Sequence, residues 1–234
     1  MSAPRRVTSG APLLSCSGRT RVPTGNDWDL PHEVGDTSRV LLSTARLTIR
    51  RFHARDAAAL AEYRSDVEVA RYQAWDAPFP LERARVLVAS FASGDPCEPG
   101  WFQYAIDLNG ALIGDIGVKL HQNRLQAKIG YTLAAPHQGR GYATEALTAF
   151  LRHLFTERRL HRVSAACDSR NHRSARLLER LGFRREGLRR KHIWIKGEWT
   201  DDLLYGLLSA DWRPPPAPDS GPPGHDGHHQ GEPA

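Results

Sequence analysis

The sequence predicts a mixed α/β fold, with a twisted, mostly antiparallel sheet, a central β-α-β crossover and helices on both faces. Three observations predict it. The first half holds period-2 strand patterns and an Asn109-Gly110 hairpin signal, which indicate antiparallel pairs. A strand, a helix, a strand and a helix then follow between residues 127 and 183, the order of a crossover unit. A hairpin pattern at residues 192–208 closes the domain, so parallel and antiparallel pairs share one sheet.

We expect one folded domain between two disordered tails. The 234 residues suit a single domain of ordinary size. Residues 1–38 are rich in Ser, Thr, Pro, Gly and Arg without periodicity, and residues 213–234 are mostly Pro, Gly, His and Asp. The folded domain is therefore predicted to span residues 39–212. The histidines of the C-terminal tail lack a supporting shell, so no metal site is expected.

Composition narrows the compartment and the partners. Three scattered cysteines, Cys16, Cys97 and Cys167, indicate a reducing, cytoplasmic setting. No apolar run reaches the roughly 20 residues of a membrane span, so no membrane partner is expected. The net charge is +6, and residues 152–196 hold fourteen Lys or Arg against four Asp or Glu. This basic stretch suits a polyphosphate ligand. RNA is another polyanion that this positive charge would attract. Too few aromatic residues lie in the stretch for base stacking, however, so a nucleic-acid partner is not expected.

Local patterns place the elements in chain order. Period-2 alternation marks the strands, a 3.6-residue period marks the helices, and capping residues mark helix ends. The predicted strands are residues 40–52 (a pair or one bent strand), 102–108, 112–120, 127–133, 162–168, 192–195 and 203–208, the last two around a turn at 196–199. The predicted helices are residues 56–63, 80–91, 143–159 and 169–181. Asp56 caps the first helix, Pro80 fits the first turn of the second, and Gly182 ends the last.

The segment from Pro136 to Ala146 joins a strand to an amphipathic helix through a glycine-containing turn. The turn thus lies at a helix N-terminus, where unpaired backbone N–H groups and a positive dipole favour a phosphate. Gly139 and Gly141 let the backbone approach an anion closely, and Arg140 adds charge. These features predict a pyrophosphate cradle.

Two common phosphate-binding motifs do not fit this turn. The dinucleotide pattern G-x-G-x-x-G needs glycine where Thr144 stands, and the Walker pattern needs an absent G-K-[ST]. What remains, Gln138-x-x-Gly141-x-Ala143, resembles the Q/R-x-x-G-x-G/A loop of the GNAT acetyltransferase superfamily, which holds the pyrophosphate of acetyl-CoA. For the hexapeptide alone, an ordinary strand-turn-helix remains the alternative.

A second segment points to the same superfamily. Residues 171–183 resemble the GNAT segment N-x-x-S/A-x-x-L-L/Y-E-K-x-G-F. Within it, Asn171-x-x-Ser174 resembles the branch of ribosomal-protein N-terminal acetyltransferases (RimJ/RimL type). The chain is identified as a member of this superfamily over roughly residues 40–212. The resemblance implies an N-acetyltransferase that moves an acetyl group from acetyl-CoA to a primary amine, on a protein N-terminus or a small molecule, in a ternary complex.

The resemblance also implies which residues hold the donor. A backbone N–H on the strand before the cradle would serve the thioester oxygen, and such a donor contributes about 3 kcal/mol. Asn171 would hydrogen-bond the pantetheine arm. The implied acetyl-CoA-binding set is Tyr131, Thr132, Leu133, Gln138, Gly139, Arg140, Gly141, Tyr142, Ala143, Thr144 and Asn171. No metal and no other cofactor is expected.

The residues for proton transfer match the superfamily less well. Many members protonate the leaving thiolate with a tyrosine, but Leu178 stands at that position here. The resemblance therefore makes Ser174 the proton donor or relay. The alternative is a structural role, in which the Ser174 hydroxyl bonds a nearby backbone group in the first turn of the helix. Lys128 stands where members commonly place an acidic base, and a protonated lysine accepts no proton. The base stays unassigned, and candidates are Asp115, His192, Glu198 and Asp201.

The acceptor pocket is placed only by resemblance. Tyr72 and Trp75 lie where GNAT proteins build that pocket, and core packing is the alternative for both. Two rival functions remain open: an inert acyl-CoA-binding or regulatory domain, and an RNA- or ribosome-associated binder that uses the arginine-rich stretch. The oligomeric state is also open, with a homodimer among the options.

Overall fold

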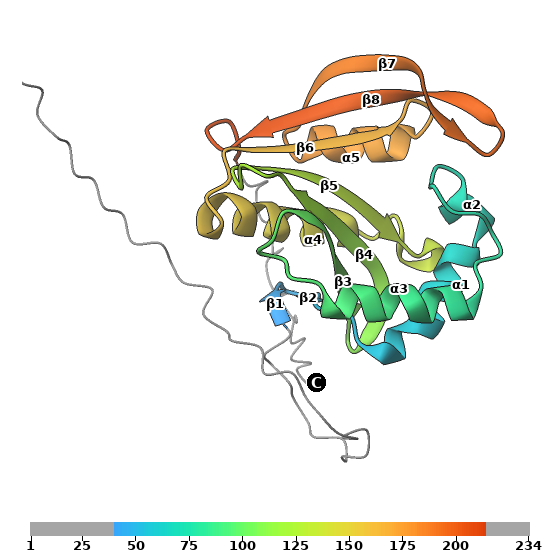
Figure 1. Cartoon of the computed structure of the whole chain (residues 1–234). Coiled ribbons are helices and arrows are strands. Elements are labelled where there is room, and N and C mark those ends of the chain that lie inside the picture. Colours follow the sequence, from blue (N-terminus) through green and yellow to red (C-terminus); the bar gives the residue numbers. More distant parts are fainter. Residues whose placement is uncertain (1–39, 214–234) are drawn as a thin grey trace, which may run out of the picture.

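The computed structural model describes residues 40–213, which form one eight-stranded sheet with helices packed on it (Figure 1). The predicted tails lie outside the described residues, Arg213 excepted. The strands are β1 (Val40–Ser43), β2 (Thr48–Arg50), β3 (Gly100–Leu108), β4 (Ala111–Leu120), β5 (Gln126–Leu133), β6 (Arg162–Asp168), β7 (Arg184–Ile195) and β8 (Glu198–Leu208). The helices are α1 (Ala57–Ser65), α2 (Val67–Ala70), α3 (Leu81–Ser93), α4 (Tyr142–Arg152) and α5 (His172–Arg180).

The sheet confirms the predicted fold class. Its strand order is β1-β2-β3-β4-β5-β6-β8-β7, and only β5 and β6 run parallel. Helix α4 connects these two strands and forms the predicted crossover, because parallel neighbours cannot be joined by a tight turn. Asn109 and Gly110, both at positive φ, make the predicted two-residue turn between β3 and β4.

Two separate cores cover the two faces of the sheet. On one face, α4 and α5 pack against β3 to β6 and β8 through residues such as Leu147, Phe150 and Leu178. On the other face, α1 and α3 pack against β3 and β4 through residues such as Leu60 and Val88. Helices on both faces were predicted, and the two clusters confirm this.

Strands β5 and β6 pair over only part of their length. Their parallel register runs from Gln126 and Arg162 to Ile129 and Ala165. Beyond those residues β5 continues to Leu133 on its β4 partner, while β6 continues to Asp168 on its β8 partner. The two strands therefore separate in the middle of the sheet, and β5 from Gly130 onward has no strand partner on the β6 side within the described chain.

The structure corrects three predicted boundaries. The last hairpin turn is the pair Lys196-Gly197, both at positive φ, so Trp199 lies in β8 and not in a turn. Strand β7 begins at Arg184, eight residues earlier than predicted. The prediction missed this part because its many charged residues show no alternation of apolar and polar positions. Helix α4 ends at Arg152 and continues as a π-helical turn (η4, His153–Glu157).

The first helical region also differs from the prediction. Asp56 does not cap α1 with its side chain; its carboxylate accepts from His53 N at 2.7 Å and from both Arg50 Nη atoms at 2.7 and 2.9 Å. Arg50 also binds Asp107 of β3, so this buried cluster ties the start of α1 to the sheet. A short helix, α2, was missed, and Pro80 is the N-cap of α3.

Candidate active site

The cradle turn lies at the first turn of α4, as predicted. Gly139 and Gly141 have φ of 75° and 81°, a region that other residues rarely adopt. A Cβ built on Gly139 would meet no heavy atom within 4 Å, so space lies open beside this backbone. No side chain caps the helix at Gly141. The geometry therefore fits a bound anion at the amino end of a helix.

Helix α5 brings basic side chains to the cradle. Arg173 Nη1 donates to Gln138 Oε1 at 3.4 Å, and Arg180 Nη1 donates to Thr144 Oγ1 at 3.5 Å. Gln138 Nε2 in turn donates to the carbonyl of Leu133 at 2.9 Å. The side chain of Gln138 thus joins the end of β5 to α5, and two guanidinium groups lie beside the turn in addition to that of Arg140.

Arg46, which the sequence analysis missed, braces the cradle from the chain segment before β2. Its Nη1 donates to the carbonyl of Arg140 at 3.2 Å, and its Nε donates to Glu145 at 2.7 Å. The guanidinium carbon also lies 4.5 Å from the ring centroid of Tyr142. Thr44 Oγ1 donates to the same Glu145 at 2.6 Å. No local pattern reveals this brace, because its partners are about 100 residues apart in the sequence.

Ser174 pairs with Tyr131 across the separation of β5 from β6. The two hydroxyl oxygens lie 2.7 Å apart. Burial raises the pKa of the Tyr131 phenol, and the bond to Ser174 acts against this shift. Asn171 Oδ1 accepts from the backbone N–H of Ser174 at 3.1 Å, so Asn171 is the N-cap of α5. The two hydroxyls and the cap form one unit at the start of α5.

Cys167 lies on the core face of β6, as the alternation predicts. Its side chain is buried in the α4 and α5 core. Burial raises the pKa of its thiol to about 11, so the thiol stays protonated near neutral pH. A protonated thiol is a weak nucleophile, so this environment does not activate Cys167 for attack.

The predicted acceptor residues lie between α2 and α3 and face the hairpin tip. Trp75 Nε1 donates to the carbonyl of Arg64 at 3.1 Å, and the Arg64 guanidinium lies 4.3 Å from the Trp75 ring centroid. Lys196 Nζ donates to the carbonyl of Trp75 at 2.7 Å, which joins the hairpin tip to this loop. Tyr72 lies half-buried, with the guanidinium of Arg170 5.9 Å from its ring centroid. Trp75 is thus held in place by Arg64 on its ring and by a hydrogen bond from its indole N–H. The ring of Tyr72 lies farther from the guanidinium group next to it.

A polar face runs across β5, β6 and β8 next to Tyr72. Alternation along the strands puts the apolar residues of these strands toward α4 and α5. Their neighbours point to the opposite side, and we call the set Lys128, Ser164, Asp168 and Asp202 the polar face. Three of its members are half-exposed, whereas the apolar neighbours are buried.

Asp168 is the one buried member of the polar face. It binds Arg170 through both of its oxygens, at 2.9 and 2.8 Å. Arg170 therefore links Asp168 to Tyr72, which places the polar face beside the predicted acceptor loop.

A family model described as an acetyltransferase (GNAT) domain matches residues 46–184, which include the cradle and Ser174. The chain belongs to the GNAT acetyltransferase family. Its sequence is similar to that of YnaD, an uncharacterized N-acetyltransferase of Bacillus subtilis (strain 168), with 34% identity over 172 residues, 74% of this chain and 99% of that protein.

Two further similarities concern the RimJ/RimL branch. Ribosomal protein uS5-alanine N-acetyltransferase of Escherichia coli (strain K12) is 32% identical over 192 residues, covering 75% of this chain and 94% of that protein. The solved structure of Mycobacterium smegmatis RimJ in complex with CoA-disulfide has a TM-score of 0.63 and 26% identity, covering 70% of this chain and 82% of that chain. The predicted family and branch are confirmed, and this GNAT protein is an N-acetyltransferase.

Three of the four candidate bases of this GNAT protein are already occupied. Asp115 is buried and accepts from the Tyr63 hydroxyl at 2.5 Å, with Arg64 3.6 Å away. Glu198 accepts from Arg170 at 2.7 Å. The fourth candidate, His192, is exposed, with its Nε2 3.2 Å from Arg189 Nη1.

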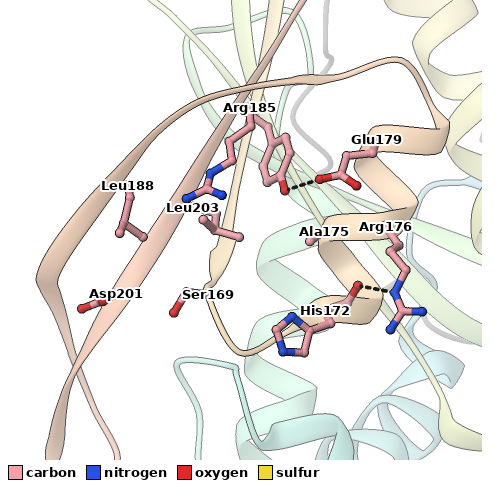
Figure 2. Close-up of a pocket in the computed structure, with 10 residues that line it drawn as sticks. Ser169, His172, Ala175, Arg176, Glu179, Arg185, Leu188, Asp201 and Leu203 are labelled. Atoms are coloured by element: carbon pink, nitrogen blue, oxygen red, sulfur yellow. Dashed lines mark hydrogen bonds between the residues drawn. The ribbon is translucent and has the colours of Figure 1, made fainter.

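Asp201, the third candidate base that is occupied, lines a pocket on the α5 side of the sheet (Figure 2). This pocket has a volume of about 470 Å³. Figure 2 shows that its side chains come from α5 on one side and from β7 and β8 on the other, with Ser169 from the turn before α5. His172 and Glu179 line it, whereas Arg173 and Arg180 of the same helix reach the cradle, so the pocket and the cradle lie on different sides of α5. Asp201 also accepts from the backbone N–H of Lys191 at 2.8 Å.

The described residues, 40–213, also bear on membrane and metal partners. Within this range, no helix has the length and the hydropathy that crossing a bilayer requires. The same residues contain no group of three or more His, Cys, Asp or Glu side chains placed to hold a metal ion.

Proposed function

We propose that this GNAT protein transfers the acetyl group of acetyl-CoA to a primary amine, and that the α-amino group of a protein N-terminus is its main acceptor. The observation that carries the proposal is the separation of β5 from β6 directly beside the cradle. A donor whose pyrophosphate lies at the N-terminus of α4 extends its arm into this separation, between the backbone of β5 and the start of α5.

The pyrophosphate, the pantetheine arm and the thioester of acetyl-CoA each have a matching part of the proposed site. The pyrophosphate meets the backbone N–H groups of the first turn of α4, from Tyr142 to Thr144, and the positive charge of Arg140. The side chains of Arg173 and Arg180 supply further positive charge nearby. The pantetheine arm lies along residues 131–133 and near the amide of Asn171. When bound, acetyl-CoA supplies the thioester whose acetyl group is transferred.

The residues around the thioester carry out three tasks. A backbone N–H of the Tyr131-Thr132-Leu133 segment, left without a strand partner, donates to the developing oxyanion, which contributes about 3 kcal/mol. The Tyr131 and Ser174 hydroxyls, 2.7 Å apart, relay a proton to the departing sulfur. The polar face and Tyr72 receive the amine from the other side of the sheet.

The acceptor is inferred from chemistry and from one relative. The Escherichia coli relative is named for the alanine of ribosomal protein uS5. An α-amino group has a reference pKa of about 7.7–8.0, against about 10.4 for a lysine side chain, so a weak base suffices to deprotonate it. A site whose family position for an acidic base holds Lys128 therefore suits an N-terminal α-amine better than a lysine side chain.

The proposal is tested by thiol release from acetyl-CoA with the full chain. Alanine-initiated peptides, polyamines and aminoglycosides serve as acceptors, and the same peptides with a blocked N-terminus serve as matched controls. We expect turnover on the free peptides and none on the blocked ones. Acetyl-CoA binding without turnover on any amine would overturn the enzyme proposal in favour of an acyl-CoA-binding domain. Tight, steeply salt-dependent RNA binding that ignores CoA would favour the RNA-binding rival.

A further inference from the structure

Asp202 is the member of the polar face that β8 contributes. In the sheet register it stands opposite Asp168 of β6 and opposite Arg189 of β7. The side chain is half-buried, yet among residues 40–213 no group gives its carboxylate a hydrogen bond or a close ion pair. Asp168, its neighbour across the strands, is bound by Arg170. Asp202 is therefore the carboxylate of the polar face whose oxygens remain open to an incoming group.

The charges around Asp202 come from every strand next to it. Lys128 on β5, together with Arg189 and His192 on β7, favours the ionised carboxylate, whereas Asp168 on β6 opposes it. Lys128 occupies the position where many GNAT proteins place an acidic base. In this chain Lys128 holds that position, and its positive charge favours the ionised form of Asp202 on β8.

The other acidic candidates do not meet these conditions. Asp201, the preceding residue in the chain, points to the opposite side of the sheet because side chains alternate along a strand, and it lines the α5-side pocket. Asp115 is enclosed by Tyr63 and Arg64, and Glu198 is bound by Arg170. Only Asp202 combines a place on the polar face with an uncommitted carboxylate among the acidic residues compared.

We propose that Asp202 is the general base that deprotonates the acceptor amine, directly or through one water, an assignment that rests on the proposed transferase function. The carboxylate takes one proton from the ammonium group. The freed nitrogen lone pair forms the C–N bond to the acetyl carbon, and the C–S bond breaks with its electron pair on sulfur. The second proton of the attacking nitrogen ends on the thiolate, and the proton held by Asp202 passes to solvent.

The surroundings of Asp202 also suit this task. Burial raises the pKa of its carboxyl group above the usual value, while Lys128 and His192 act in the other direction. A raised pKa makes a carboxylate a stronger base, provided that it stays ionised at the working pH. Activity should then fall on the acid side as the pH drops through the pKa of Asp202.

The test compares Asp202→Asn with its neighbour variant Asp201→Asn in the full chain. Both substitutions remove one carboxylate charge from β8, but on opposite sides of the sheet. At neutral pH we expect Asp202→Asn to lower kcat about 100-fold, the lower end of the range for general acid–base catalysis. The affinity for acetyl-CoA should stay at the wild-type value, Asp201→Asn should stay near wild-type turnover, and Asp202→Glu should restore part of the loss.

The pH profile separates a base from a structural residue. Above the pKa of an α-amino group, about 7.7–8.0, the acceptor is already neutral, so the deficit of Asp202→Asn should narrow. Wild-type turnover by Asp202→Asn would overturn the assignment of Asp202 as the base and leave the transferase proposal standing. An equal loss of kcat at every pH, together with weakened acetyl-CoA binding, would do the same. No turnover by the wild-type chain on any amine would overturn the transferase proposal and this assignment with it.

Discussion

The donor side and the acceptor side of the proposed site are built in different ways. The donor side is one continuous stretch, from the end of β5 through the Gly139 to Gly141 turn into α4, and it presents mainly backbone groups. The acceptor side is assembled from β5, β6, β8 and the loop before α3, and it presents charged and aromatic side chains. A donor that always carries the same pyrophosphate suits a fixed backbone cradle. An acceptor is instead selected by side chains, which can be exchanged without altering the fold.

The two sides also differ in how they are held. The cradle is tied down by Gln138 and Arg46, whose hydrogen bonds reach β5 and the carbonyl of Arg140. On the acceptor side, Lys196 ties the hairpin tip to the Trp75 loop, but Asp202 and Tyr72 keep open polar or aromatic surface. This contrast predicts that donor-side changes alter acetyl-CoA affinity, whereas acceptor-side changes, such as Asp202→Asn, alter turnover.

The largest effect on affinity is expected from Gly141→Glu. The new side chain must adopt the left-handed backbone of φ 81°, and its carboxylate would compete with the pyrophosphate at the first turn of α4. An anion at a helix N-terminus is stabilised by up to ~2 kcal/mol, which corresponds to about 30-fold in Kd. We expect acetyl-CoA binding, measured by calorimetry, to weaken by up to about that factor.

Gly110→Glu is the matched control for this substitution. Gly110 also has a positive φ, of 87°, and open space around it, but it lies in the β3–β4 turn away from α4. It therefore carries the same backbone strain without touching the cradle. Unchanged affinity in Gly141→Glu, or an equal loss in both variants, would refute the assignment of the pyrophosphate to this turn.

The same contrast explains what could be predicted from sequence. The glycines of the cradle and the Asn171-x-x-Ser174 cap act through neighbours within one turn of helix, so their spacing is visible in the chain. The polar face is not visible in this way, because Lys128 and Asp202 are brought together only by the strand order β5-β6-β8. Asp201 and Asp202 are adjacent in sequence, and only the register shows which of them points away from α5.

Other missed features have physical causes of the same kind. Strand β7 carries charge at most of its exposed positions, so its alternation gives no apolar signal. Asp56 matches the pattern of a helix cap, but its carboxylate forms an ion pair with buried Arg50 and makes no capping hydrogen bond to α1. At Asp56 an ion pair with a strand residue thus outweighs the local capping preference, and at β7 the strand forms without an apolar alternation.

A smaller effect is expected at the boundary between the two sides, from Ser174→Ala. The substitution removes the hydroxyl 2.7 Å from Tyr131 and leaves the backbone of α5 in place. Thiolate is a tolerable leaving group, with a thiol pKa of about 8.5, so the relay should contribute less than the usual 10²-fold. We expect kcat to fall roughly tenfold, with the affinity for acetyl-CoA unchanged, in a steady-state thiol-release assay.

Tyr131→Phe and Ser169→Ala complete this experiment. If the two hydroxyls act as one relay, Tyr131→Phe should cost a similar factor, and the double variant should cost little more than either single one. Ser169 lines the α5-side pocket, so Ser169→Ala controls for loss of a hydroxyl near the start of α5. Wild-type turnover in Ser174→Ala would return Ser174 to a structural role.

The smallest effect is expected from Arg46→Ala, which removes the brace but no predicted ligand group. Its ion pair with Glu145 is partly exposed, and such pairs contribute ~0.2–1 kcal/mol, so acetyl-CoA affinity should weaken by a factor of about 1.4 to 5. Arg85→Ala, which breaks an exposed ion pair with Glu82 on α3, should leave the affinity unchanged. An equal loss of affinity in both variants would show that Arg46 has no specific link to the cradle.

Acid unfolding gives a second readout for Arg46. Burial acts to raise the pKa of Glu145, but hydrogen bonds from Thr44 and Arg46 outweigh it and hold this pKa below its usual value. A lowered carboxyl pKa stabilises the fold above the unfolded value of about 4.3, and the contribution is lost as the pH falls through the folded pKa. Arg46→Ala should therefore lose less stability than the wild type on acidification, measured by denaturant unfolding at each pH. An unchanged acid dependence would mean that Thr44 alone holds the Glu145 carboxylate, and that the segment between β1 and β2 braces the donor side only through that hydroxyl.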